Sequence, residues 1–295
     1  MSRLPPWIRL SRQTDKHFNE VTGMVRGHAL NTVCESAKCP NRGECWNSGT
    51  ATLMLLGDVC TRSCAFCAIQ PGRPDAVDVH EPRRAARAAV GMNLKYVVLT
   101  SVNRDDLADG GAGIFAETIE EIRKRLPTAG IEVLTPDFEG VNESLVMVLR
   151  ARPDVFNHNV ETVARLQPII RPQASYGRSL SVLRQAAQWE PRVVVKSGIM
   201  LGLGERDDEV EETLRDMREA GVELLTIGQY LQPTRQHPPV QRYVEPGRFD
   251  AWTVMAKNMG FKGVASGPMV RSSYKADELL ASALKARHEA SVATA

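Results

Sequence analysis

Residues 52–67 read Thr52-Leu53-Met54-Leu55-Leu56-Gly57-Asp58-Val59-Cys60-Thr61-Arg62-Ser63-Cys64-Ala65-Phe66-Cys67. The apolar run that ends at Gly57 predicts a short buried strand. Three cysteines follow in the next loop with the spacing C-x3-C-x2-C. Three close thiolates can hold three irons of a [4Fe–4S] cube and leave the fourth iron open to a small molecule, whereas most electron-transfer clusters use four cysteines.

A structural zinc site is the alternative interpretation of this trio. Zinc sites usually combine two pairs of cysteines, or cysteine with histidine, so that four ligands surround the ion. No fourth cysteine or histidine of that kind stands near Cys60, Cys64 and Cys67. The spacing therefore favours an iron–sulfur cluster with one open iron.

A second cysteine trio precedes the first. Residues 34–45 read Cys34-Glu35-Ser36-Ala37-Lys38-Cys39-Pro40-Asn41-Arg42-Gly43-Glu44-Cys45, which has the spacing C-x4-C-x5-C and is again one ligand short. The two trios account for all six cysteines. Because reducing compartments disfavour disulfides, we interpret the six thiols as metal ligands.

Composition and charge narrow the class of protein. The 295 residues are 43% hydrophobic and 24% charged, which is typical of a soluble globular chain with a large core. The net charge of +2 is too balanced to indicate nucleic-acid binding. No apolar run is long enough for a membrane span, and the first residues lack the apolar stretch of a secretory signal. We therefore expect a cytoplasmic protein that binds neither nucleic acid nor membrane.

Apolar runs alternate with amphipathic segments from residue 52 onward. The six expected strands cover residues 52–57, 96–100, 131–135, 155–159, 193–198 and 224–228. Continuous apolar strands that alternate with helices indicate a parallel sheet covered by helices. Six units are too few for an eight-unit barrel, so we predict an α/β fold, a partial (β/α)6 barrel, with an open doubly wound sheet as the alternative. In either fold the active site lies at the carboxyl ends of the strands.

The same pattern suggests how the chain is divided. Residues 113–126 and 207–220 carry apolar residues at helical spacing and are predicted helices. Residues 1–50 look irregular and form an N-terminal extension with the first cysteine trio. Residues 51–230 form the barrel core, and residues 231–295 form a C-terminal extension.

The cysteine motifs resemble those of a known family. The spacing C-x3-C-x2-C after a first strand, with Phe66 before the last cysteine, resembles the radical SAM (S-adenosylmethionine) superfamily. Within it, the strings Cys39-Pro40-Asn41-Arg42-Gly43-Glu44-Cys45-Trp46 and Arg271-Ser272-Ser273-Tyr274 resemble the lipoyl synthase family. Residues 100–107, 157–162 and 196–205 are similar to the same family, so the resemblance spans about residues 5–280.

The resemblance implies a barrel of the radical SAM type with two [4Fe–4S] clusters. The implied ligands are Cys60, Cys64 and Cys67 for the cluster that binds SAM, and Cys34, Cys39 and Cys45 for an auxiliary cluster. The fourth auxiliary ligand is a serine oxygen, which matches Ser273, with Ser272 as the alternative. Oxygen is a weaker partner for such iron than thiolate. Ser273 is therefore also expected to serve catalysis, by letting its iron leave when the cluster gives up sulfur.

The implied activity is insertion of two sulfur atoms at C6 and C8 of a protein-bound octanoyl-lysine, with sulfur taken from the auxiliary cluster. The implied partners are octanoylated lipoyl carrier domains (E2 subunits of 2-oxoacid dehydrogenases and the H protein of glycine cleavage), reduced ferredoxin or flavodoxin, and an iron–sulfur carrier that rebuilds the cluster. Two alternatives stay open. One is another radical SAM sulfur inserter, such as a methylthiotransferase or a biotin-synthase-like enzyme. The other is a metal-stabilised binding or redox module without SAM chemistry.

Six residues are expected to contact SAM. They are Asn159, Glu161, Arg178, Lys196, Gly202 and Glu205. Lys196 stands in an apolar strand, where a charge needs a partner, and the SAM carboxylate and Glu161 are the two candidates. His237 lies in a proline-rich loop and is a candidate for contact with the substrate.

Overall fold

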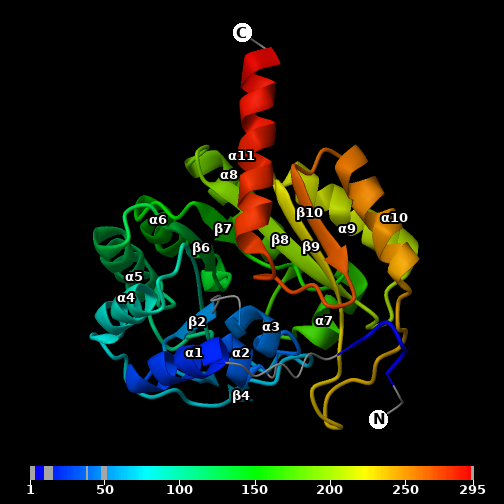
Figure 1. Cartoon of the computed structure of the whole chain (residues 1–295). Coiled ribbons are helices and arrows are strands. Elements are labelled where there is room, and N and C mark those ends of the chain that lie inside the picture. Colours follow the sequence, from blue (N-terminus) through cyan, green and yellow to red (C-terminus); the bar gives the residue numbers. More distant parts are fainter. Residues whose placement is uncertain (1–3, 10–15, 38, 48–51, 294–295) are drawn as a thin grey trace.

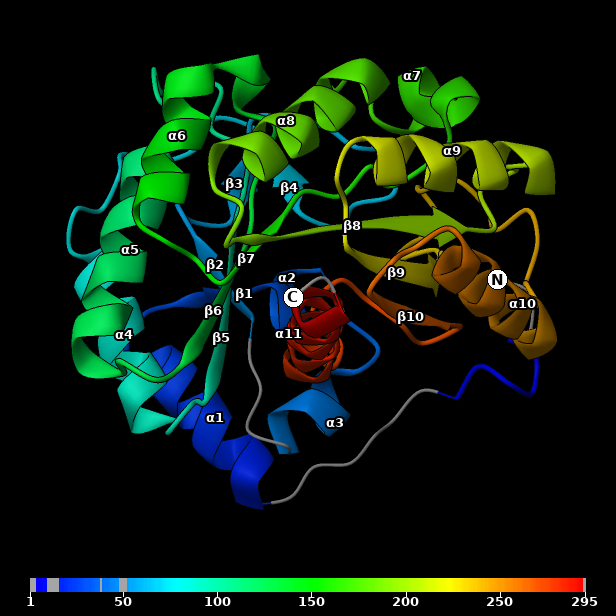
Figure 2. The ribbon, with the colours of Figure 1, turned by 90° about the horizontal axis from the view of Figure 1, so that it is seen from above.

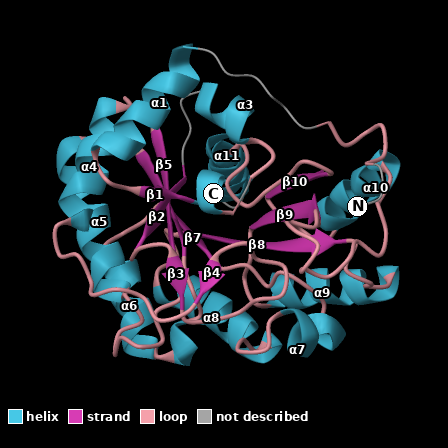
Figure 3. Ribbon diagram, turned by 90° about the horizontal axis from the view of Figure 1, so that it is seen from below, coloured by secondary structure: helices cyan, strands magenta, loops and turns pink. Residues whose placement is uncertain are grey.

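The structure is a computed structural model that describes residues 4–9, 16–37, 39–47 and 52–293. Its main sheet contains β1 (Asn31–Thr32), β2 (Thr52–Leu55), β5 (Tyr96–Ser101), β6 (Gly130–Leu134), β7 (Val155–Asn157), β8 (Val194–Leu201), β9 (Leu224–Gln229) and β10 (Gly263–Gly267), side by side in that order. All neighbours pair in parallel except β1, which is antiparallel to β2. The short strands β3 (Val59–Cys60) and β4 (Gln70–Pro71) form a separate parallel pair (Figure 3).

The six strands predicted from the sequence are all present, and their order distinguishes the two candidate folds. From β2 to β9, each strand of the main sheet lies beside the next one in the chain. A doubly wound sheet reverses its order at a switch point, so that alternative is excluded. The sheet curls as a partial barrel (Figure 2), and β10 adds one parallel strand beyond the six expected.

Helices cover the outer face of the curled sheet (Figure 2). The longer ones are α4 (Glu81–Gly91), α5 (Ala112–Arg125), α6 (Asn142–Arg150), α8 (Tyr176–Trp189), α9 (Asp207–Glu219) and α10 (Pro246–Asn258). The single-turn helix α7 (Gln167–Ile170) and the 3-10 turns η1 (Phe138–Gly140) and η2 (Ala164–Leu166) lie between them. The bounds of α5 and α9 agree with the predicted helices. Among the described residues, no helix is long and apolar enough to cross a membrane.

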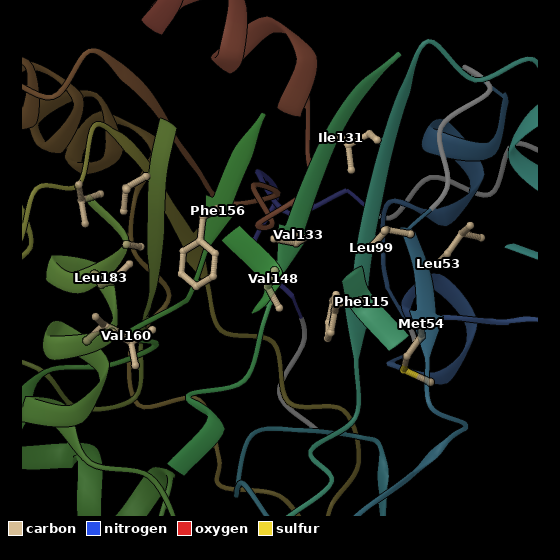
Figure 4. Close-up of a cluster of buried hydrophobic side chains, with 14 of the residues drawn as sticks. Leu53, Met54, Leu99, Phe115, Ile131, Val133, Val148, Phe156, Val160 and Leu183 are labelled. Carbon is tan, nitrogen blue, oxygen red and sulfur yellow. The ribbon is translucent and has the colours of Figure 1, made fainter. Parts of the chain in front are cut away.

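The main core lies between these helices and the outer face of the sheet. Successive strand residues point to opposite faces, and Ile131 and Val133 of β6 point toward the helices, where Phe115 of α5 packs (Figure 4). All three side chains are fully buried. Burying one such side chain contributes roughly 1.5–3 kcal/mol, so the apolar outward face holds each strand against its helix. The inward residues are thereby left free for polar roles.

The first fifty residues are more regular than predicted. They form α1 (Lys16–Gly27), the short helices α2 (Val33–Ser36) and α3 (Arg42–Asn47), and β1. The prediction of an irregular segment was wrong, because α1 is amphipathic and buries Val21 and Val25, which lie one turn apart. The segment is anchored by Trp46, which is fully buried and whose ring lies 5.1 Å from that of Phe18.

The helix α11 (Ala276–Ala293) lies at the end of the barrel where the strands begin (Figure 1). Its residues Leu279 and Ala283 pack against Val155, Val194 and Leu224, which are the first residues of β7, β8 and β9. In Figure 1, α2 and β4 lie at the opposite end of the sheet from α11. The helix thus closes the amino ends of the strands and leaves the carboxyl ends for a site.

A buried ion pair crosses the inner face of the barrel. Lys196 of β8 donates to Glu132 of β6 at 2.8 and 3.0 Å, and both side chains are fully buried. Glu132 also accepts hydrogen bonds from Tyr96 (3.0 Å) and Asn157 (3.1 Å). The predicted alternatives for the partner of Lys196 did not include Glu132. The four side chains form a buried polar layer, in which removal of one charge leaves the other unpaired. Within the described residues, Asn157 Oδ1 is the atom of this layer that has no hydrogen-bond partner.

We expect Lys196→Met to lower the free energy of unfolding by about 3–5 kcal/mol, because it leaves the Glu132 carboxylate buried without its cation. The double variant Lys196→Met/Glu132→Gln removes both charges and should lose clearly less. Urea unfolding of the metal-free, reduced chain measures the difference. Equal losses in the single and double variants would contradict the pairing.

Candidate functional site

A cavity of about 1050 Å³ lies at the carboxyl ends of the strands. Its wall includes residues that end or follow successive strands, such as Ser101, Asn159 and Gln229. The cysteines that line it are Cys34, Cys39, Cys60, Cys64 and Cys67, and Ser272 and Ser273 line it as well. Residues of both cysteine trios and the two C-terminal serines therefore face one cavity.

The loop with the C-x3-C-x2-C trio is held firmly at the rim of the barrel. It leaves β3 and returns on β4, where the Gly72 amide donates to the Cys60 carbonyl at 2.8 Å. The Asn103 amide donates to the Cys60 sulfur at 3.3 Å. At the other side of the loop, the Ala65 amide donates to the Ile170 carbonyl at 2.8 Å. The backbone thus presents the three thiols to the cavity from a fixed position.

A buried ion network fixes the same loop from within. Arg62 is 4% exposed and pairs with Asp105 (2.7 Å) and with Asp137 (2.7 Å). Burial of Asp137 opposes its ionisation, yet the hydrogen bond and charge of Arg62 outweigh it and lower the Asp137 pKa to about 2. Arg178, predicted to contact SAM, is the outer partner of Asp137 at 3.2 Å and does not line the cavity.

The first trio comes from α2, the turn after it, and α3. Cys34 lies in α2 and Cys45 in α3, and the Cys39 amide donates to the Cys34 carbonyl at 3.2 Å. The thiol of Cys45 does not line the cavity wall, but the neighbouring Cys34 and Cys39 act on its pKa. The structure therefore brings the three predicted ligands together.

The C-terminal serine motif is tied to this trio by hydrogen bonds that cross most of the sequence. Asn41 Nδ2 donates to the Met269 carbonyl at 2.6 Å, and the Tyr274 hydroxyl donates to Glu44 at 2.9 Å. Because Met269 and Tyr274 flank residues 271–273, the two serines are carried to the first trio. This contact brings the C-terminal serine motif to the segment that carries the first trio.

The two serines of the motif have different partners. Ser273 Oγ accepts a hydrogen bond from Thr52 Oγ1 at 2.9 Å, and the pairing of Leu53 with Thr32 brings Thr52 alongside the start of α2, which carries Cys34. Ser272 Oγ instead accepts from Asn159 Nδ2 at 2.5 Å. Ser273 thus lies on the side of the first trio, whereas Ser272 faces the ends of the barrel strands.

Asn159 and Glu161, both predicted to contact SAM, line the cavity together. Asn159 Nδ2 donates to Glu161 Oε1 at 3.1 Å. Burial raises the pKa of Glu161, opposed by the charge of Arg171 and the hydrogen bond from Asn159. Arg171 also lines the cavity and donates to the carbonyls of Asn159 (3.1 Å) and Val160 (3.3 Å). These groups form an ionic corner beside the second trio.

The thiols themselves fit iron ligation. Burial raises the pKa of Cys67 to about 12 and that of Cys45 to about 12, and it also raises the pKa of Cys34 and Cys64. Thiolates are the ligand form, so these sites need the positive charge that iron brings. Among the described residues, no three Cys, His, Asp or Glu side chains converge on a point that one metal ion could occupy. The cluster assignment rests on the donor chemistry of the trios and on the family.

Several buried polar atoms in the cavity wall fit a bound polar ligand. Within the described part of the chain, no hydrogen-bond partner is present for Ser101 Oγ, Asn103 Oδ1, Thr135 Oγ1, Asn159 Oδ1 and Arg171 Nε. Buried polar groups are normally satisfied. A ligand with amino, carboxylate and hydroxyl groups, such as SAM, would satisfy donors and acceptors of this kind.

Three other predicted SAM contacts do not line the cavity. Lys196 points to the same face of β8 as Gly198, which does line it, but two residues earlier and so roughly 7 Å deeper in the barrel. Glu205 accepts from the amides of Gly202 (2.6 Å) and Leu203 (2.9 Å), which braces the turn after β8. At Gly202, with φ of +102°, a Cβ atom would lie 2.2 Å from Gln229 Nε2. An ion pair, a braced turn and a close backbone approach thus give these three residues structural roles.

His237 was predicted to face the substrate, but both of its ring nitrogens are engaged. Nδ1 lies 2.8 Å from Thr234 Oγ1, and Nε2 lies 2.9 Å from the Cys67 carbonyl. The ring therefore fastens the proline-rich loop to the loop of the second trio. Neighbouring residues of that loop, including Pro233, Arg235 and Tyr243, complete the cavity wall.

Sequence reasoning missed Thr52, Arg171 and the pair Arg62–Asp137. Thr52 was counted only as the start of an apolar strand, and Arg171 was not considered. The sequence does contain a signal for Arg171. It is a lone charge between Ile169-Ile170 and a proline, and such a charge is either exposed or paired with a buried group. The partner of Arg62 lies 75 positions away in the sequence, and no local pattern indicates it.

Comparisons with known proteins agree with this geometry. The family model of the radical SAM superfamily matches residues 54–217. The lipoyl synthase of Rubrobacter xylanophilus is 54% identical over 93% of this chain and 85% of the relative, and that of Symbiobacterium thermophilum is 50% identical over 97% and 90%. The crystal structure of methylornithine synthase (PylB) has 17% identity and a TM-score of 0.51, covers 64% of this chain and 55% of its own, and supports the fold.

The two closely matching relatives carry the same name and cover nearly the whole chain, including the first cysteine trio and the C-terminal serines. The two alternatives left open by the sequence do not account for this match. One was another radical SAM sulfur inserter, and the other was a module without SAM chemistry. The chain belongs to the lipoyl synthase family of the radical SAM superfamily.

Proposed function

We propose that this one cavity performs both halves of the family's reaction, the radical SAM-dependent insertion of two sulfur atoms at C6 and C8 of a protein-bound octanoyl-lysine. The observation that supports this is that residues of both trios and both serines line the same space. An alkyl chain lying between the two trios is exposed to hydrogen abstraction on one side and to sulfur on the other. Enclosure also keeps a reactive radical from water and other partners.

In our proposal, Cys60, Cys64 and Cys67 hold one [4Fe–4S] cluster, which, with SAM bound, supplies the 5′-deoxyadenosyl radical. The chain's own contribution is to hold the three thiols rigidly. The Arg62–Asp137 pair ties the loop to the end of β6, and the amide of Asn103 donates to the Cys60 sulfur. Cofactors carry the hard step, while the protein positions and shields them.

We assign SAM binding to the ionic corner of Asn159, Glu161 and Arg171. Arg171 is 8% exposed and has an unsatisfied Nε, which suits it to the SAM carboxylate. Glu161 is an acceptor for the amino group or the ribose hydroxyls. Of the six contacts predicted from the sequence, this assignment keeps Asn159 and Glu161 and adds Arg171.

Cys34, Cys39, Cys45 and Ser273 are the proposed ligands of the auxiliary cluster, which supplies sulfur. Ser273 is favoured over Ser272 because it lies beside Thr52 and Cys34, whereas Ser272 is engaged by Asn159. Arg271 lies near Cys39, and burial lowers its pKa while the Cys39 charge opposes this. A cation at this place offsets the negative charge that three thiolates bring.

Lipoyl synthases act on lipoyl carrier proteins. We propose as partners the octanoylated E2 subunits of 2-oxoacid dehydrogenases and the H protein of glycine cleavage, reduced ferredoxin or flavodoxin as electron donor, and an iron–sulfur carrier for cluster rebuilding. We also propose a cytoplasmic location. We propose that the division into residues 1–50, 51–230 and 231–295 separates functions and not independent structural domains. The reason is that β1 and β10 extend the same sheet as the core.

Ser273→Ala and Cys39→Ala are expected to separate the two halves of the reaction. Both variants should still form 5′-deoxyadenosine from SAM with an octanoyl-lysine peptide under anaerobic reducing conditions, because the second trio is intact. Both should fail to add two sulfurs, as measured by mass spectrometry of the peptide. Wild type should hold about eight irons per chain. Zinc in the purified chain, or no SAM cleavage by wild type, would overturn the proposal.

Arg171→Gln is expected to raise the SAM concentration for half-maximal cleavage at least tenfold, since a charged hydrogen-bond partner is worth about 1.5–3 kcal/mol. Arg178→Gln is the matched control, because Arg178 pairs with Asp137 outside the cavity. It should change that concentration by less than about threefold. A larger effect from Arg178 than from Arg171 would reverse the assignment.

A further inference from the structure

The hydroxyl of Thr52 links the start of the barrel to the C-terminal serine motif. Thr52 begins β2, is 5% exposed and lines the cavity. Its Oγ1 donates to Ser273 Oγ at 2.9 Å, and the pairing of Leu53 with Thr32 brings Thr52 alongside the start of α2, which carries Cys34. One residue of the barrel thus bonds one proposed auxiliary ligand, Ser273, and lies beside the helix that carries another, Cys34.

A hydroxyl at this position is not what packing alone would select. β2 is buried along its whole length, and its remaining residues are Leu53, Met54 and Leu55. A β-branched apolar residue such as valine has the same shape as threonine and suits a buried strand. A buried hydroxyl needs a partner to offset its desolvation, and the partner that Thr52 has is Ser273.

We propose that Thr52 is a positioning residue for the auxiliary cluster, holding Ser273 Oγ toward the first trio and stabilising that oxygen when it is bound to iron. The inference rests on the proposed role of Ser273 and deepens it. A serine side chain rotates freely about one bond, and the neighbouring Ser272 shows that this turn can direct a hydroxyl elsewhere. The bond from Thr52 selects the rotamer that faces Cys34.

Two effects of this hydrogen bond oppose each other. Their relative sizes decide whether the bond strengthens or weakens the hold of Ser273 on iron. Donation to the serine oxygen withdraws electron density and so weakens its bond to iron. It also stabilises the negative charge that the oxygen acquires on binding, and such charge-assisted hydrogen bonds are about twice as strong as neutral ones. In a buried wall, where water does not replace the donor, the second effect is larger. Loss of the hydroxyl therefore loosens the iron held by Ser273.

The experiment isolates the auxiliary site in the full-length chain. A parent variant with Cys60, Cys64 and Cys67 changed to alanine is reconstituted anaerobically and should hold about four irons. Thr52→Val and Thr52→Ser are then made in this parent. Release of ferrous iron to a chelator is followed by absorbance. We expect release from Thr52→Val to be about tenfold faster than from the parent, and release from Thr52→Ser to stay within about twofold.

Thr100 provides a matched control. It lies on the neighbouring strand β5, is 5% exposed and lines the same cavity, but its hydroxyl donates to the Leu134 carbonyl at 2.8 Å. Thr100→Val makes the same chemical change without touching Ser273, and should leave iron release within about twofold of the parent. Far-ultraviolet circular dichroism and urea midpoints of all variants verify folding.

A second cycle tests whether Thr52 acts through Ser273. In the Ser273→Ala background, Thr52→Val should add no further acceleration. The proposal is overturned if Thr52→Val releases iron at the parent rate, if Thr100→Val accelerates release equally, or if the effect persists without Ser273. A parent that holds no iron would instead remove the auxiliary cluster, and with it both the proposed function of the first trio and this inference.

Discussion

The site depends on a meeting of the two ends of the chain. Three side-chain hydrogen bonds make it, from Asn41, Thr52 and Tyr274, and they join residues 228, 221 and 230 positions apart. Loop-closure entropy rises only slowly with chain length, so the distance along the sequence is a modest obstacle. The orientation is more demanding, and the sheet supplies it, because β1 delivers the N-terminal segment and β10 delivers the C-terminal one.

The barrel separates two kinds of polar group by depth. Near the amino ends of the strands, Lys196 and Glu132 satisfy each other and are closed off from solvent. Beyond the carboxyl ends of the strands, Asn159, which follows β7, and Arg171, which ends α7, keep atoms that nothing in the described chain satisfies. Fully paired groups stabilise and stay inert, whereas unsatisfied ones beside a cavity are available to a ligand. The same sheet thus provides a rigid base and a receptive wall.

Sequence patterns predicted the parts of this molecule that depend on local chemistry. The six strands were predicted because each is a continuous apolar run, and the cysteines because ligand spacing within a loop is a local property. Ser273 was matched by resemblance, and the Thr52 contact now gives that choice a physical reason. Asn159 and Glu161 follow a strand end and line the cavity there, while their contact with SAM stays a prediction.

Features that depend on depth or on distant partners could not be predicted in this way. Lys196 was expected at the cavity, yet the two-residue period of a strand places it one step below Gly198. Its partner Glu132 lies 64 positions away. Arg178 was expected to contact SAM but pairs with Asp137. The burial of Asp137 depends on the fold and cannot be read from the sequence. The short helices α2 and α3 were missed because four and six residues are too few to show a helical period.

The late position of Ser273 also has a bearing on biosynthesis. Chains fold from the amino end as they are made, so Thr52 leaves the ribosome 221 residues before Ser273, and the first trio leaves it earlier still. A nascent or prematurely ended chain would present three thiols around an open corner and no oxygen to close it. In our proposal, the auxiliary centre is therefore complete only once residue 273 has been made.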